Sequence, residues 1–202
     1  LLKDLPWDCT FDQQKAFPSV QKHHSTNQTC YCVDLSAATD NFPLSLQMSV
    51  LGEIFGDDNE FIQLFGFLSR STWSSQELGD INWTKGQPMG LYPSFASFGL
   101  THGLLLLTLC KGNYHGQFYV VGDDVIILEK PLFEAYTKVL TLLECPYSPD
   151  KTIVSDCFAE FAGRIITHNM IIPQLKLNSL SDDSFLDILT LLGQKARVFL
   201  TP

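Results

Sequence analysis

Residues 118–128 read Phe-Tyr-Val-Val-Gly-Asp-Asp-Val-Ile-Ile-Leu, two apolar runs on either side of a short acidic turn. Aromatic and β-branched residues flanking a glycine turn predict a β-hairpin with Asp123 and Asp124 at its tip. Two adjacent like charges repel each other, so folding alone does not account for the pair. We therefore expect these carboxylates to hold a divalent metal ion.

A second copy of the tripeptide, Gly56-Asp57-Asp58, serves as an internal control. Phe55 precedes it and Asn59-Glu60 follow it, so no alternating strand stands on either side. We expect Asp57 and Asp58 to be solvated at the end of a helix. The hairpin setting, and not the tripeptide itself, carries the indication of a site.

Composition predicts a folded chain of one domain or slightly more. The 202 residues are 45% hydrophobic and only 17% charged, which supplies a core and argues against disorder. The polar start of the chain predicts no signal peptide, and the longest apolar run, residues 104–109, is far too short to span a membrane. Six scattered cysteines form no disulfide framework and fit a reduced compartment.

The charge of the chain conflicts with nucleic-acid binding by this chain alone. The net charge is −9, and the 13 lysines and arginines never form a block. A complete nucleic-acid enzyme normally presents a basic stripe. Either nucleic acid is not the ligand, or the basic parts lie outside this chain.

Hydrophobic periodicity predicts an α+β fold, an antiparallel sheet covered on one face by helices. Residues 1–28 are polar and show little periodicity, which indicates a connecting segment, and we expect His23 and His24 to be solvated. Asp40 is a candidate N-cap for a helix that opens at Pro43. The further predicted elements are a strand at 29–35, helices at 43–55 and 61–70, a hairpin or loop at 71–85, a glycine-bracketed loop at 86–90, a helix at 93–111, the hairpin at 117–129, a helix at 131–144, a turn at 148–151, a short hairpin at 158–172 and a final helix at 184–192 capped by 181–183.

Asp34 supplies a second acidic strand end. It closes the predicted strand 30–35 just as Asp123 closes the strand 118–121. Neighbouring strands could bring both carboxylates to one sheet edge, where they would bridge two cations about 3.5–4 Å apart. An oxygen-only site suits Mg²⁺, with Mn²⁺ as a substitute.

Five segments, in this order, resemble motifs A to E of a viral RNA-dependent RNA polymerase palm: Asp34–Asp40, Gly86–Gly90, Gly122–Asp124, Asp150–Thr152 and Glu160–Arg164. The sequences of these motifs are similar to those of polymerases of the narnavirus, mitovirus and ourmia-like lineage, which is distantly related to the leviviral replicases. Residues 180–187 also look ourmia-like, so the resemblance covers about residues 30–195. It implies a palm with an RRM/ferredoxin-like core that performs template-directed RNA synthesis by two-metal nucleotidyl transfer.

The resemblance also implies roles in the chemistry. Asp34 and Asp123 would ligate two Mg²⁺ ions, with Asp124 assisting and the backbone carbonyl of Leu35 completing a metal shell. Lys151 would protonate the leaving pyrophosphate as a general acid. A surface lysine in a turn is the structural alternative for Lys151.

The resemblance implies contacts to nucleotide and RNA as well. Asp40 would face the ribose and select the 2′-OH, hydrogen-bonded to Ser94. Arg164 would grip a backbone phosphate of the primer. The remaining candidates are Thr101 on the same helix as Ser94 and the flexible loop of Gly86, Gln87 and Gly90, whose glycines can take positive φ and which would cradle template and incoming base.

Each of these contacts has a structural alternative. Ser94 could be a small residue for close helix packing, Arg164 a partner in an ion pair, and residues 86–90 a plain turn. His102 is expected to pack or hydrogen-bond on its helix.

Two departures from the wider polymerase pattern matter. Many relatives place an asparagine on the motif B helix to pair with the second motif A aspartate, and residues 94–110 contain none. No segment rich in arginine or lysine precedes Asp34, and nearly all of a thumb is missing. We therefore expect a fragment of a larger replicase: a connection from the fingers at 1–28, the palm at 29–173 and the start of a thumb at 174–202.

The implied partners are an RNA template and nascent RNA, NTPs, and the missing fingers and thumb of the same polymerase, acting in the host cytoplasm or, for a mitovirus-like enzyme, the mitochondrion. Two other functions remain open: reverse transcription on the same palm, and a catalytically silent, virus-derived protein that binds RNA or other proteins.

Overall fold

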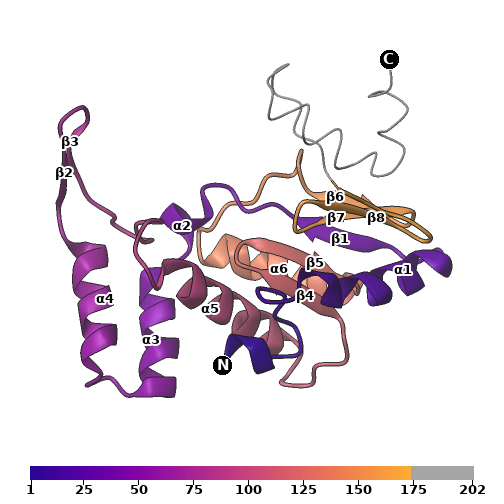
Figure 1. The fold of residues 1–202 in the computed structure, drawn as a ribbon, viewed down its shortest axis with the longest axis horizontal. Coiled ribbons are helices and arrows are strands. Elements are labelled where there is room, and N and C mark those ends of the chain that lie inside the picture. Colours follow the sequence, from indigo (N-terminus) through magenta and orange to yellow (C-terminus); the bar gives the residue numbers. More distant parts are fainter. Residues whose placement is uncertain (174–202) are drawn as a thin grey trace, which may run out of the picture.

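A four-stranded antiparallel sheet forms the centre of the computed structural model, which describes residues 1–173. Its strands lie in the order β4 (Phe118–Val121), β5 (Asp124–Ile127), β1 (Cys30–Val33) and β6 (Ile153–Ser155) (Figure 1). Along the chain, helices separate β1 from the β4–β5 hairpin and that hairpin from β6. This β-α-β-β-α-β arrangement is the ferredoxin-like pattern, so the predicted palm core is confirmed.

Two helices, α5 (Ser94–Leu109) and α6 (Lys130–Leu142), cover one face of this sheet. Every second strand residue points at them, as the two-residue period of a strand requires. The contacting core residues include Tyr31, Val33, Val125 and Ile127 from the strands and Phe98, Leu106, Tyr136 and Leu140 from the helices.

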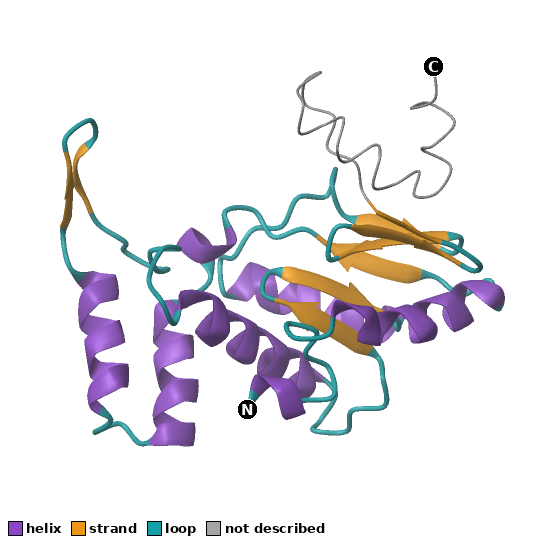
Figure 2. Cartoon of the chain, in the orientation of Figure 1, coloured by secondary structure: helices purple, strands orange, loops and turns teal. Residues whose placement is uncertain are grey.

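The opposite face is also covered, which the sequence did not predict. Helix α1 (Phe17–Ser25) and a three-stranded sheet of β7 (Phe158–Phe161), β8 (Arg164–Thr167) and β9 (Ile171–Pro173) pack against it (Figure 2). The hairpin expected at 158–172 is therefore part of a larger meander. Burial from both sides explains why β1, β4 and β5 are almost continuously apolar.

Residues 1–28 contain regular structure and pack against the central sheet, which their weak periodicity did not predict. Short 3-10 turns at Leu2–Asp4 and Gln13–Ala16 precede α1, and Trp7 and Cys9 exchange backbone hydrogen bonds of 2.9–3.0 Å with Val120 at the edge of β4. The imidazole of His24 is buried on the same side of α1 as Val20, although solvation was expected. The helix is short and otherwise polar, which hides its apolar stripe in the sequence. The boundary between fingers and palm stays a prediction.

Two further helices stand to one side of the sheet (Figure 1). They are α3 (Leu44–Phe55) and α4 (Glu60–Arg70), and a small hairpin of β2 (Trp73–Ser75) and β3 (Gly79–Ile81) extends beyond α4. Asp57 and Asp58 are exposed after α3, which confirms the prediction that they are solvated at the end of a helix.

Asp40 does not cap α3. It lies inside a separate short helix, α2 (Ala38–Asn41), and Pro43 stands at the N-cap of α3 without a side-chain hydrogen bond. The helix predicted at 184–192, its cap at 181–183, the ourmia-like stretch at 180–187 and the thumb segment 174–202 lie outside the described residues. In residues 1–173 we find no helix with the length and apolar character needed to cross a bilayer.

Candidate active site

The pairing of β1 with β5 brings two acidic strand ends together. Val33 stands opposite Val125 in this antiparallel pair, so the register carried one residue further sets Asp34 opposite Asp124. Both side chains line a cavity of about 410 Å³, together with Asp150, Lys151 and Glu160. Lys151 Nζ lies 3.7 Å from Asp34 Oδ2. The predicted motifs A, C and D thus meet at one place.

Asp123 lies on the other side of the same turn. It lines a neighbouring cavity of about 280 Å³, where Leu35 and Ser94 are also found. The four predicted metal ligands therefore surround one turn but are divided between two cavities. In residues 1–173 no three acidic, histidine or cysteine side chains converge closely enough to hold an ion as they stand.

The charge around Asp124 is unbalanced. The residue keeps an exposed surface toward its cavity, yet the protein atoms around the carboxylate withdraw it from water. This burial raises the pKa of Asp124 to about 6, and repulsion from Asp123, Glu160 and Asp34 adds to the effect. A hydrogen bond from the backbone of Ala162 opposes it.

These observations test whether the residues fit a divalent cation. The donor set consists of carboxylate oxygens, which hard cations such as Mg²⁺ and Mn²⁺ prefer. A cation would also offset the repulsion that Asp123, Glu160 and Asp34 add to the effect of burial on Asp124. The donor chemistry therefore fits such an ion, which would have to draw the carboxylates closer together than they lie in residues 1–173 of this structure.

Sequence reasoning missed Glu160 as a contributor to this site, although it stands in the predicted motif E. It lies on β7, in the sheet that packs on the face of the central sheet opposite α5 and α6, and it lines the same cavity as Asp124. Only the packing of one sheet on the other brings it to Asp124.

The loop that carries Lys151 fixes the backbone of Asp34. The amide of Ser148 donates to the carbonyl of Asp34 at 2.8 Å, and the amide of Ser36 donates to the carbonyl of Pro146 at 2.9 Å. Leu35 and Tyr147 form an isolated antiparallel bridge between these two bonds. The bridge uses the carbonyls of Asp34 and Pro146, so that of Leu35 is not engaged in it.

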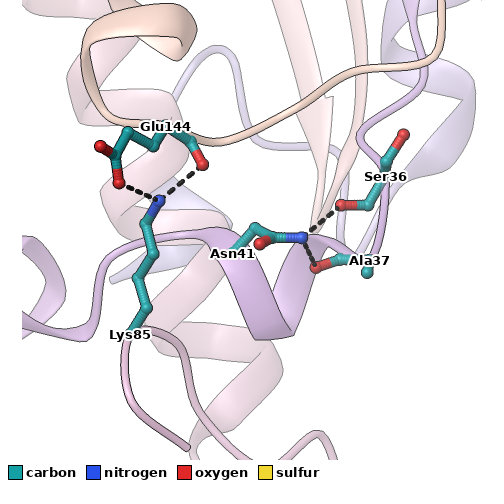
Figure 3. A network of polar contacts seen from close by, with 5 residues as sticks. All are labelled: Ser36, Ala37, Asn41, Lys85 and Glu144. Atoms are coloured by element: carbon teal, nitrogen blue, oxygen red, sulfur yellow. Dashed lines mark hydrogen bonds and ion pairs between the residues drawn. The ribbon is translucent and has the colours of Figure 1, made fainter.

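The turn that follows Leu35 is held by side chains (Figure 3). Asn41 Nδ2 donates to the carbonyls of Ser36, at 3.0 Å, and Ala37, at 3.2 Å. Ala37 has a φ of 44°, which is unfavourable for a residue with a side chain. Lys85 Nζ donates to the carbonyl of Glu144 at 2.5 Å and lies 3.7 Å from its Oε2, which fastens the entry of the glycine loop to the end of α6.

Gly86 is required for close approach and not for positive φ. A Cβ on Gly86 would lie 2.6 Å from the carbonyl oxygen of Asp40 and closer still to that of Thr39. Neither Gly86 nor Gly90 has positive φ, so the expectation of positive φ at these glycines is wrong. The amide of Gln87 donates to the carbonyl of Thr39 at 2.8 Å, and its buried side chain donates to the carbonyl of Ser94 at 2.9 Å.

The predicted bond between Asp40 and Ser94 is not formed. Asp40 Oδ1 instead accepts a hydrogen bond of 2.8 Å from the indole Nε1 of Trp83. Ser94 Oγ and Thr101 Oγ1 are buried, and neither has a hydrogen-bond partner among the described residues. Burial of Thr101 in the core leaves no surface there for direct contact with RNA. Sequence reasoning missed Trp83, because no local pattern links it to Asp40.

Arg164 begins β8, opposite Phe161. Its side chain is partly exposed, and it makes no ion pair within residues 1–173. The charge therefore stays available to an anionic ligand.

His102 makes two hydrogen bonds inside the core, which confirms the expectation for it. Its Nδ1 lies 2.8 Å from the carbonyl oxygen of Gly122, and its Nε2 lies 2.6 Å from the hydroxyl of Tyr136. Burial lowers the pKa of His102 to about 4, so the imidazole is neutral near pH 7.

Comparison with known sequences identifies relatives of the whole described region. The family model for the mitovirus RNA-dependent RNA polymerase matches residues 1–185. The chain is 33% identical over 174 residues to the RNA-directed RNA polymerase of Cryphonectria parasitica mitovirus 1, covering 84% of this chain and 21% of that polymerase. It is 28% identical over 176 residues to an uncharacterized mitochondrial protein of Arabidopsis thaliana, covering 81% of this chain and 69% of that protein.

Solved structures share the fold at low sequence identity. The RNA-dependent RNA polymerase of a human picobirnavirus superposes with a TM-score of 0.62 at 14% identity, over 84% of this chain and 36% of that one. Telomerase from Candida albicans superposes with a TM-score of 0.60 at 11% identity, over 96% of this chain and 40% of that one. The fold by itself is therefore shared by an RNA-dependent RNA polymerase and by a telomerase.

Proposed function

The chain belongs to the mitovirus RNA-dependent RNA polymerase family, and from this premise we propose that it is the catalytic palm of an enzyme that copies RNA. The observation that carries the proposal is the pairing of β1 with β5, which sets Asp34 opposite Asp124 beside Lys151. The chain spans 21% of the length of the mitovirus polymerase that it matches. Fingers and thumb of the same polymerase would supply the remaining surfaces.

Asp34, Asp123, Asp124 and the carbonyl of Leu35 would hold the metal ions of this site. When bound, two Mg²⁺ ions, or Mn²⁺ in their place, favour ionisation of the attacking 3′-hydroxyl and neutralise charge on the leaving pyrophosphate. Lys151 stands next to Asp34 and would donate a proton to that pyrophosphate. The crowding of Asp123, Glu160 and Asp34 around Asp124 supports this assignment, because a cation relieves the repulsion among carboxylates.

Selection of the nucleotide would fall to the loops beside the turn. Asp40 would meet the ribose 2′-hydroxyl, with Trp83 in the orienting role that asparagine plays in many relatives. Gly86 and Gln87, fixed against Thr39, would shape the floor under the incoming base. Arg164 would contact a backbone phosphate of the primer.

The negative net charge of the chain agrees with a palm that binds metal ions while other parts of the polymerase bind RNA. A net charge of −9 suits the part of a polymerase that holds metal ions, while a basic tunnel for RNA would come from the fingers and thumb.

The mitochondrion is the compartment that we propose for this activity. The family is that of mitoviruses, and an Arabidopsis thaliana relative is described as mitochondrial. A second candidate function is a virus-derived protein without catalysis, because the relatives of this chain include an uncharacterized mitochondrial protein of Arabidopsis thaliana as well as a viral polymerase.

RNA synthesis by the complete protein tests the proposal. Purified protein, an RNA template with a primer, NTPs and Mg²⁺ should yield extended RNA, and Asp34→Asn should reduce the rate by at least about 100-fold. Asp58→Asn, in the second Gly-Asp-Asp tripeptide, is the matched control and should leave the rate unchanged.

Equal rates for Asp34→Asn and Asp58→Asn would contradict the assignment of the site. Incorporation of dNTPs in preference to NTPs would indicate reverse transcription instead. A folded complete protein with no synthesis under any metal would favour the non-catalytic function.

A further inference from the structure

We propose that His102 is a positioning residue that holds the Gly122-Asp123-Asp124 turn in the geometry needed to bind metal ions. This inference rests on the proposed function, because it concerns how the same site is aimed. The imidazole reaches the turn from α5, 20 residues earlier in the chain, and connects it to α6 through Tyr136.

The hydrogen bonds define the state of the imidazole. The carbonyl oxygen of Gly122 can only accept, so His102 Nδ1 must carry a hydrogen and donate to it. In a neutral imidazole Nε2 is then the acceptor, and the hydroxyl of Tyr136 donates to it. Both nitrogens are satisfied, so the ring has one tautomer and one orientation.

The turn needs an external restraint at this point. Gly122, at a φ of 59°, gives the turn a backbone with more conformational freedom than any other residue would, and the two carboxylates that follow it repel each other. Helix α5 contacts the turn along one face, at Phe95, Gly99 and His102, which are spaced at one turn of helix. Phe95 and Gly99 limit how closely the turn approaches α5, whereas the hydrogen bond from His102 holds the backbone of the turn against the helix.

The surroundings of His102 argue against a role in packing alone. Its ring lies 5.6–5.9 Å from the rings of Phe42, Phe98 and Tyr136, and it is fully buried. Burying a polar ring among aromatic side chains is unfavourable unless its nitrogens are hydrogen-bonded. An apolar residue of similar volume could fill the same space but could not donate a hydrogen bond to Gly122. That hydrogen bond is therefore what the imidazole supplies beyond packing.

Direct binding of Mn²⁺ to the complete protein, followed by electron paramagnetic resonance, tests the inference apart from activity. His102→Leu keeps the approximate volume and removes the donor, and we expect its Mn²⁺ dissociation constant to rise by about 10- to 100-fold. His102→Asn offers an amide donor near the position of Nδ1 and should recover part of the affinity. In RNA synthesis His102→Leu should lower kcat while KM for NTP stays within about twofold.

A second pair of variants keeps the test decisive if His102→Leu does not fold. Tyr136→Phe removes only the hydroxyl that orients the imidazole and should weaken Mn²⁺ binding by about tenfold. Tyr114→Phe is the matched control, because its hydroxyl donates to a backbone carbonyl, that of Phe118, away from the turn. It should bind Mn²⁺ as the unmodified protein does.

Wild-type Mn²⁺ affinity in folded His102→Leu, or equal affinities for Tyr136→Phe and Tyr114→Phe, would overturn the positioning role. If the unmodified protein synthesises RNA while these variants bind Mn²⁺ normally, the inference fails alone. If the unmodified protein binds no Mn²⁺, the proposed function fails and the inference fails with it.

Discussion

Replacing Gly86 by alanine should destabilise the protein, because the structure leaves no room for a methyl group there. A Cβ would lie 2.6 Å from the carbonyl oxygen of Asp40, whereas ordinary contact begins at 3.4 Å. The loop or α2 must therefore move by at least about 0.8 Å. Both neighbouring oxygens, those of Thr39 and Asp40, belong to the backbone. The oxygen of Thr39 also accepts the hydrogen bond from the amide of Gln87.

Overpacking of this kind costs about 1–3 kcal/mol in free energy of unfolding. For a domain of this size, each kcal/mol shifts Tm by about 2–4 °C, so we expect a decrease of about 2–12 °C. Gly90→Ala provides the matched control in the same loop. Nothing lies within 4 Å of a Cβ there and its φ is not positive, so reduced freedom of the unfolded chain should raise stability by about 0.4–1 kcal/mol.

Differential scanning calorimetry of the two variants measures the difference. Opposite signs, with Gly86→Ala below and Gly90→Ala at or above the unmodified protein, are expected. Equal Tm values would refute the reasoning that Gly86 is selected for contact between the glycine loop and motif A.

Three other results are expected. Trp83→Phe removes the indole N–H that holds Asp40, so the ratio of kcat/KM for NTP over dNTP should fall by about three- to tenfold; an unchanged ratio would exclude Trp83 from sugar selection. The pKa of Asp124 is raised from 3.8 to about 6, so the native state binds more protons than the unfolded state between these values, and stability should fall as pH rises from about 4 to 6. Solvent screening limits this fall to below about 1 kcal/mol, and urea titrations at several pH values should show that Asp124→Asn removes it. Trp7→Ala should cost about 3–5 kcal/mol in urea denaturation, whereas Phe11→Ala, at a side chain that is 70% exposed, should cost almost nothing; equal effects would place residues 1–28 outside the core.

Local patterns were sufficient to predict the central elements. The β4–β5 hairpin follows from the two apolar, β-branched runs on either side of Gly122. Helix α5 follows from its long apolar composition, and α6 follows from the helical spacing of its apolar residues. The meeting of Asp34 with the hairpin carboxylates was predicted only in part. The sequence suggested that Asp34 and Asp123 close neighbouring strands, whereas the neighbour of β1 is β5, which begins at Asp124, so the antiparallel register sets Asp34 opposite Asp124.

Features that depend on packing between distant segments were not predictable. Trp83 reaches Asp40 across 43 residues, and Glu160 reaches the site only through the packing of two sheets. Burial of α1 depends on a sheet face that no local signal in residues 1–28 describes. The sequence also suggested the wrong reason for Gly86, because a close backbone contact and a positive φ both select glycine.

The stoichiometry of Mn²⁺ binding to the complete protein tests the central claim most directly, namely that Asp34, Asp123 and Asp124 form one two-metal centre. Isothermal titration should show two Mn²⁺ ions bound per unmodified protein and a loss of at least one in Asp123→Ala. Asp58→Asn, which changes the other Gly-Asp-Asp tripeptide, should still bind two. The same number and affinity of ions in Asp123→Ala as in Asp58→Asn would contradict the account.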